Sequence, residues 1–90
     1  MNAFLFKRGC TESINGDSVI LRNEDGETFK VNKIVYLIWD ICEGIHFNDL
    51  LISLAFGSRD DAIRLTQSLE DLLKDLSNSK LLYIKQIDNY

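Results

Sequence analysis

Apolar residues form strand-length runs in the first third of the chain. Ala3–Lys7 and Ser18–Arg22 are short and apolar, and residues 28–31 alternate between an apolar and a polar face. The polar residues 23–26 separate the last two runs and end in a glycine that is free to take a positive φ angle. This pattern predicts a β-hairpin. We expect Ala3–Lys7 to complete one small antiparallel sheet, which has at least one edge strand.

Helical spacing replaces strand spacing in the second part of the chain. Asn32 is a natural N-cap for a helix over residues 33–43, which ends before Gly44. This helix is apolar on nearly all sides, which is typical of a central and largely buried helix. Its Trp39 shares a face with Cys42, and we expect both side chains to be buried in the core.

Two further helices are predicted. One covers about residues 47–56 and ends at Gly57, and the next begins after Ser58, which can cap it. Residues 81–87 fit either an extended tail or a further strand. The third helix has a predicted buried stripe of Ala62, Leu65, Leu69, Leu72, Leu73 and Leu76. Together, the elements predict a winged-helix-like α+β fold, with a three-stranded antiparallel sheet followed by three helices.

Composition and charge narrow the classes of function. The 90 residues are 46% hydrophobic and 27% charged, with no linker-like segment, so we expect one domain over residues 1–90. The net charge of −4 disfavours nucleic-acid binding, which usually needs a basic face. No apolar run approaches the roughly 20 residues of a membrane span, and no signal peptide is recognisable. We therefore expect a cytoplasmic protein that does not bind membranes.

The sequence offers no arrangement of residues that is typical of catalysis. Its single histidine, His46, stands at a helix start, where a capping or surface role is the simplest interpretation. Cys10 and Cys42 each stand alone, so their spacing indicates neither a zinc site nor a redox motif. We therefore expect no enzyme activity, no metal and no cofactor.

The most specific motif of the chain begins at Asn32 and ends at Gly44, with Trp39 between them. This block resembles the PqqD family, which includes the coenzyme PQQ synthesis protein D. The family also includes the peptide-recognition elements of pathways that modify ribosomally made peptides. The similarity extends over residues 17–84. Lys80 departs from the family pattern, because glycine is common at that position.

The resemblance implies a non-catalytic adaptor, a peptide chaperone of natural-product biosynthesis. Such domains bind the leader segment of a precursor peptide as an added strand beside their third strand, in a groove closed by the third helix. They present the precursor to a modifying enzyme, such as a radical SAM enzyme, or to a leader peptidase. The peptide-binding positions expected on the strand of this chain are Thr28, Phe29, Lys30 and Val31. Those expected on the third helix are Ile63, Thr66, Gln67, Glu70 and Lys74.

A winged-helix regulator that binds nucleic acid is the alternative. The third helix argues against it, since residues 59–76 hold three basic and five acidic side chains. Ile63 is open to two interpretations, a groove residue or a singly exposed apolar side chain. The sequence also leaves open the precursor, the partner enzyme and the oligomeric state.

Overall fold

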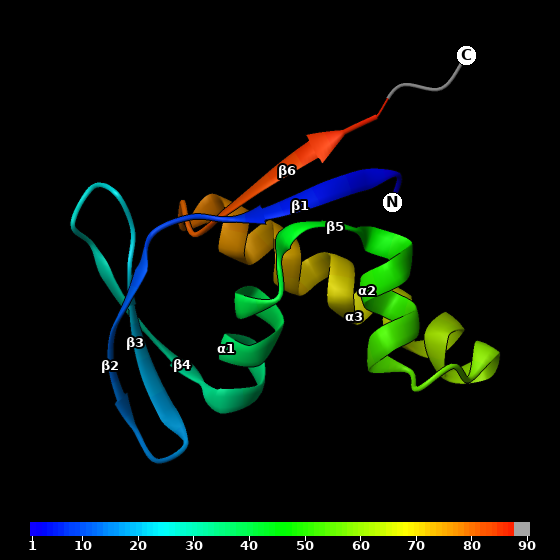
Figure 1. Cartoon of the computed structure of the whole chain (residues 1–90), viewed down its shortest axis with the longest axis horizontal. Helices are drawn as coiled ribbons and strands as arrows, with labels where there is room; N and C mark the ends of the chain where they lie inside the picture. The colour runs from blue at the N-terminus through cyan, green and yellow to red at the C-terminus, as the bar shows by residue number, and fades with distance from the viewer. Residues whose placement is uncertain (88–90) are drawn as a thin grey trace.

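The computed structural model describes residues 1–87, which form three helices and six strands (Figure 1). In chain order these are β1 (Ala3–Lys7), β2 (Cys10–Asn15), β3 (Ser18–Arg22), β4 (Thr28–Asn32), α1 (Lys33–Asp40), β5 (Glu43–His46), α2 (Phe47–Leu54), α3 (Arg59–Asn78) and β6 (Leu82–Gln86). The predicted α+β class is confirmed, and the strand left open near the C-terminus is β6. Within the described part of the chain, no helix has the length and apolar character that crossing a membrane requires.

The strands form two antiparallel sheets of three strands, whereas the sequence pattern predicts one sheet. The sheet of order β2-β3-β4 contains the predicted hairpin, and β1 lies in the other sheet, of order β5-β1-β6 (Figure 1). The place beside β3 is taken by β2, a polar strand that apolar patterning does not reveal. Gly9 (φ +82) turns the chain from β1 to β2, where a Cβ atom would lie 2.1 Å from the Arg22 carbonyl oxygen.

The first helix is shorter than predicted. α1 ends at Asp40, with Ile41 as its C-cap, and the chain then enters β5. β5 pairs with one edge of β1, and next to it the Lys7 N–H donates to the Cys42 carbonyl at 2.5 Å. β6 pairs with the other edge of β1. This long-range pairing outweighs the helical preference of residues 41–43.

One core lies between the two sheets and the helices. Leu5 and Leu82 enter it from the β5-β1-β6 sheet, and Val19 and Leu21 enter it from the β2-β3-β4 sheet. α3 packs against α2 and β6. It contributes the buried residues Leu69, Leu73 and Leu76.

Two predictions of burial are wrong in part. α1 buries only Ile38 and Trp39 and is otherwise half-buried or exposed, because this short helix meets the core along one side. On α3, Leu65 is exposed, and Ala62 and Leu72 are only half-buried. A stripe of apolar residues indicates which face turns inward, but it does not indicate how far the neighbouring elements cover that face.

The burial predicted for Cys42 is confirmed. Its thiol has no exposed surface and donates to the Ile38 carbonyl at 3.2 Å. Burial raises the pKa of this thiol to about 11, so it stays protonated and unreactive at neutral pH. Cys10 is exposed on β2 and forms no disulfide with it.

Trp39 joins α1 to the segment that precedes β6. Its side chain is 2% exposed, which confirms the prediction, and the indole N–H donates to the Leu81 carbonyl at 2.7 Å. The Lys7 ammonium lies 5.2 Å from the centroid of the indole ring. The residue therefore combines packing, a buried hydrogen bond and a cation–π contact.

We expect Trp39→Ala to lower the free energy of unfolding by about 3–5 kcal/mol, because it removes this packing and leaves a cavity. Trp39→Phe keeps most of the buried volume and should cost clearly less. Urea denaturation followed by circular dichroism measures both variants. A denaturation midpoint of Trp39→Ala within error of the wild type would contradict the packing described for this side chain.

Candidate functional site

β4 is an edge strand. β3 pairs with one side of it over its whole length, from Arg22 opposite Thr28 to Ser18 opposite Asn32. No strand among residues 1–87 pairs with its other side. The outward N–H and C=O groups of β4 are therefore free to pair with an added strand.

An open groove of about 350 Å³ runs between β4 and the C-terminal half of α3. Phe29, Lys30 and Val31 line it from β4. Leu72, Asp75 and Leu76 line it from α3, and Val35 of α1 and Leu81 close it. Apolar side chains predominate in the lining, and it also includes one basic residue, Lys30, and one acidic residue, Asp75. Such a lining suits apolar side chains that project from an extended segment beside β4.

A buried asparagine fixes the position of the hairpin relative to α3. Asn23, in the β3–β4 turn, is 3% exposed. Its side-chain N–H groups donate to the Ser79 carbonyl at 3.0 Å and to the Glu27 carboxylate at 3.1 Å. Its side-chain oxygen accepts from the backbone N–H groups of Asp25 at 3.0 Å and Glu27 at 2.9 Å. All four hydrogen-bonding positions of the amide are used, so the turn is held at the end of α3.

An ion pair adds a second contact between the β3–β4 turn and the end of α3. Lys80 and Asp25 are paired, and this hydrogen bond raises the pKa of the Lys80 ammonium group. Lys80 has φ +60, the left-handed region that favours glycine. Here a lysine adopts this backbone, and its side chain contacts the hairpin.

The junction between β4 and α1 is also capped as predicted. The Asn32 side-chain oxygen accepts from the Val35 N–H at 2.8 Å, so β4 ends where α1 begins. At the other end of α1, the Lys7 ammonium contacts Asp40 at 2.9 Å and Glu43 at 3.1 Å. These hydrogen bonds raise the pKa of Lys7. Capping and ion pairing thus hold both ends of the helix that contributes Val35 to the groove.

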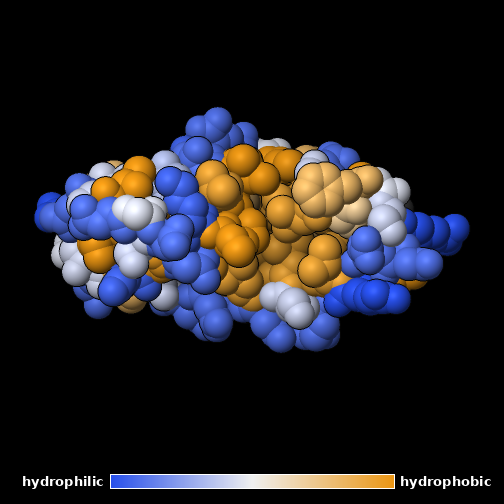
Figure 2. Space-filling view, turned by 90° about the horizontal axis from the view of Figure 1, so that it is seen from below, coloured by the Kyte–Doolittle hydropathy of each residue, from blue (hydrophilic) through white to orange (hydrophobic). Residues whose placement is uncertain are grey.

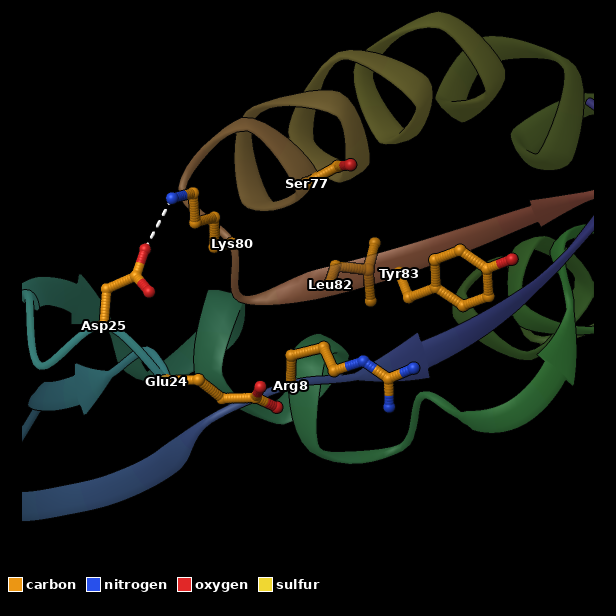
Figure 3. Close-up of a pocket in the computed structure, with 7 residues that line it drawn as sticks. All are labelled: Arg8, Glu24, Asp25, Ser77, Lys80, Leu82 and Tyr83. Atoms are coloured by element: carbon orange, nitrogen blue, oxygen red, sulfur yellow. Dashed lines mark hydrogen bonds and ion pairs between the residues drawn. The ribbon is translucent and has the colours of Figure 1, made fainter.

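A second hollow, of about 300 Å³, lies where the β3–β4 turn meets the end of α3 and the start of β6 (Figure 3). Four of its seven lining side chains are charged: Arg8, Glu24, Asp25 and Lys80. Figure 3 shows them projecting from the end of β1, the β3–β4 turn and the end of α3. The Arg8 guanidinium lies 5.3 Å from the Tyr83 ring centroid. The lining thus combines two basic and two acidic side chains.

His46 has a structural role. It caps α2, with Nδ1 accepting from the Asn48 N–H at 3.1 Å, and Nε2 lies 2.8 Å from the Asn2 side-chain oxygen. Both ring nitrogens therefore have partners. Within residues 1–87, no three His, Cys, Asp or Glu side chains lie close enough together to hold a metal ion.

The predicted strand residues Thr28, Phe29, Lys30 and Val31 all lie on the edge strand β4. The predicted helix residues lie elsewhere on α3 and do not line the groove. These residues are Ile63, Thr66, Gln67, Glu70 and Lys74. Ile63 is 68% exposed, and Glu70 binds the N-terminal ammonium group at 3.3 Å.

The pattern of the sequence does not identify the α3 residues that line the groove. Leu72 and Leu76 fall on the apolar stripe that predicts burial, and only the position of the hairpin along α3 identifies them as groove residues. That position is fixed by Asn23, whose partner Ser79 lies 56 residues away. In the sequence, Asn23 has the features of an ordinary turn residue, so no local signal predicts its contact with Ser79.

The chain was compared with protein-family models, with curated proteins and with solved structures, and none of the three comparisons gave a significant match.

We expect Asn23→Ala to lower the free energy of unfolding by about 1–3 kcal/mol, because it leaves buried polar groups of the turn and of Ser79 without their partner. Asn15→Ala, on the exposed strand β2, is the matched control and should stay within about 0.5 kcal/mol of the wild type. Urea denaturation measures both. Equal stabilities of the two variants would show that the Asn23 contacts do not hold the hairpin.

Proposed function

We propose that this chain is a non-catalytic adaptor that binds the leader segment of a ribosomally made precursor peptide. The leader pairs as an added strand with β4 and inserts apolar side chains into the groove beside α3. The observation that carries this proposal is an open strand edge directly beside a mostly apolar groove.

The two features supply different parts of recognition. Pairing with the backbone of β4 is independent of the peptide's sequence, so it contributes affinity and register. Alternate side chains of an added strand point to opposite faces, so every second one can enter the groove. Leu72 and Leu76 then select apolar residues, and Lys30 and Asp75 can each pair with an opposite charge on the peptide.

The resemblance to the PqqD family supports the same function. In support, β2, β3 and β4 precede the three helices, as the resemblance implies, although β5 lies between α1 and α2. In this interpretation β1, β5 and β6 are a second sheet added to that unit. The proposed partner enzyme is one that modifies the precursor, such as a radical SAM enzyme, or a leader peptidase. The adaptor itself is proposed to need no metal or cofactor.

The acidic surface of α3 disfavours the alternative of nucleic-acid binding. Its basic residues are Arg59, Arg64 and Lys74, and its acidic residues are Asp60, Asp61, Glu70, Asp71 and Asp75. A helix that contacts phosphate groups needs the opposite balance. Peptide binding at β4 does not require an excess of basic residues on α3.

The proposal predicts different effects for one substitution at two places on α3. Leu72→Asp puts a charge into the groove and should weaken peptide binding by roughly tenfold or more. Ile63→Asp makes the same change on an exposed residue outside the groove and should leave the affinity unchanged within error. Lys30→Ala should also cost little, because backbone pairing on β4 does not depend on that side chain.

The probe is the leader segment of a short precursor gene beside the gene for this chain, or the tightest binder from a library of short extended peptides. Titration calorimetry measures affinity, after circular dichroism has shown that each variant is folded. Equal affinities of Leu72→Asp and Ile63→Asp would contradict binding in this groove. Failure of every peptide to bind the wild type would contradict the proposed function as a whole.

A further inference from the structure

Two further hollows continue the groove along the helices. The first, which we call the middle hollow, has a volume of about 130 Å³ and is lined by residues of α1, α2 and α3. One of these residues is Leu72, which also lines the groove. The second, which we call the outer hollow, has a volume of about 220 Å³ and shares Ile38 and Leu54 with the middle hollow. Each hollow therefore has a wall in common with the next, in the order groove, middle hollow, outer hollow.

The order of the three hollows follows the turn of α1. Successive residues of an α-helix are about 100° apart, so Val35, Ile38 and Ile34 are neighbours around the helix axis. Val35 lines the groove, Ile38 lines the middle and outer hollows, and Ile34 lines the outer hollow. On α3, Leu72 borders the groove and the middle hollow, and Leu65 lines the middle hollow alone. The three hollows thus form one continuous path around a flank of α1.

The lining of the middle and outer hollows is apolar apart from the single hydroxyl group of Ser68. By contrast, the groove contains Lys30 and Asp75. An apolar side chain can therefore enter either hollow without the desolvation of a charged group. An apolar cavity of about 150 Å³ holds benzene, so the outer hollow has room for an aromatic ring, and the middle hollow suits a smaller aliphatic side chain.

The side chains along this path are exposed although they are apolar. Ile34 is 69% exposed, Leu37 is 51% exposed and Leu65 is 36% exposed. Figure 2, which views the molecule from below Figure 1, shows a continuous apolar area in the middle of the face with polar residues around it. In Figure 1, α1 and α2 lie on that lower side. Contiguous apolar surface with a polar rim is typical of a binding site.

Continuity with the groove indicates what occupies the two hollows. β4 ends at Asn32 and α1 begins at Lys33, so a segment paired with β4 has α1 directly beyond the Asn32 end of the strand. Leu72 forms the wall between the groove and the middle hollow, so the next side chains of that segment can enter the middle hollow. The segment bound at β4 is therefore the occupant that the shared walls favour.

We propose that the leader segment paired with β4 continues over α1 and inserts two apolar side chains, an aliphatic one into the middle hollow and an aromatic one into the outer hollow. This inference rests on the proposed function, because it extends the same peptide beyond the groove. It narrows the substrate class from any extended peptide to one in which an apolar segment flanks the strand-forming segment. Pairing with β4 is independent of sequence, and the two hollows add selectivity for apolar side chains.

The test compares peptides that share one strand segment, the tightest binder from a library of peptides of strand length. This segment is extended at either end, in separate peptides, by a flank rich in leucine and phenylalanine or by a flank of serine and glycine. In titration calorimetry, the apolar flank at one end should tighten binding to the wild type roughly tenfold or more, because it buries two large side chains. The polar flank should leave the affinity unchanged within error.

Two variants separate the hollows from the groove. Ile34→Asp puts a charge into the outer hollow and Leu65→Asp puts one into the middle hollow, and neither residue lines the groove. An acidic residue in the first turn of α1 is favourable for the helix, so Ile34→Asp should remain folded, as circular dichroism can show. Each variant should bind the strand segment alone as the wild type does and lose most of the gain from the apolar flank. Ile52→Asp, at an exposed isoleucine of α2 that lines neither hollow, is the matched control and should keep the gain.

The outcomes distinguish this inference from the proposed function. If the strand segment alone does not bind the wild type, the proposed function fails and the inference fails with it. If the strand segment binds and neither apolar flank tightens binding, the proposed function stands and the inference is overturned. A gain that Ile34→Asp and Leu65→Asp leave intact, or that Ile52→Asp removes, overturns it as well. Self-association of the free chain that Ile34→Asp abolishes, with no gain from the flank, would assign the hollows to a second copy and overturn the inference too.

Discussion

The groove beside β4 depends on one buried amide. Asn23 is the only polar or charged residue that is buried among residues 1–87, and its side chain joins the β3–β4 turn to the end of α3. A buried amide is costly unless all its hydrogen bonds are made, so the turn and the helix end have essentially one relative position. This position sets Leu72, Asp75 and Leu76 opposite β4. Besides this contact, the buried side chains of Val19 and Leu21 and the continuation of β4 into α1 hold the hairpin.

α1 takes part in both the core and the groove. Its sequence is apolar nearly all round, and each side is apolar for a different reason. Trp39 faces the core, Val35 lines the groove, and Ile34 is exposed. A helix of only eight residues therefore takes part in folding and in the proposed peptide binding. Because these sides are distinct, substitutions can separate the two roles.

The sequence predicts the local elements well, because their signals are local. The caps Asn32 and Ser58, the hairpin and the long third helix all depend on residues within a few positions of each other. The wrong predictions concern partners that are distant in the chain. β1 pairs with β5 and β6 instead of the hairpin, and nothing in its own five residues selects one partner over another.

The same distinction between local signals and long-range contacts applies to the candidate site. Its strand half, β4, follows from alternation and from the position of the turn, so the sequence alone identifies it. Its helix half depends on how far along α3 the hairpin docks, and the long-range contact of Asn23 determines that distance. The residues predicted on this helix, Ile63, Thr66, Gln67, Glu70 and Lys74, lie on α3 but do not line the groove.

Hydrogen exchange of the wild-type chain, with and without a saturating bound peptide, tests the central claim most directly. Added pairing on the open edge should slow the exchange of the β4 amides that face away from β3, while the amides of β2, the other edge of the same sheet, exchange as before. Protection that appears on β2, with β4 unchanged, would contradict binding at the β4 edge.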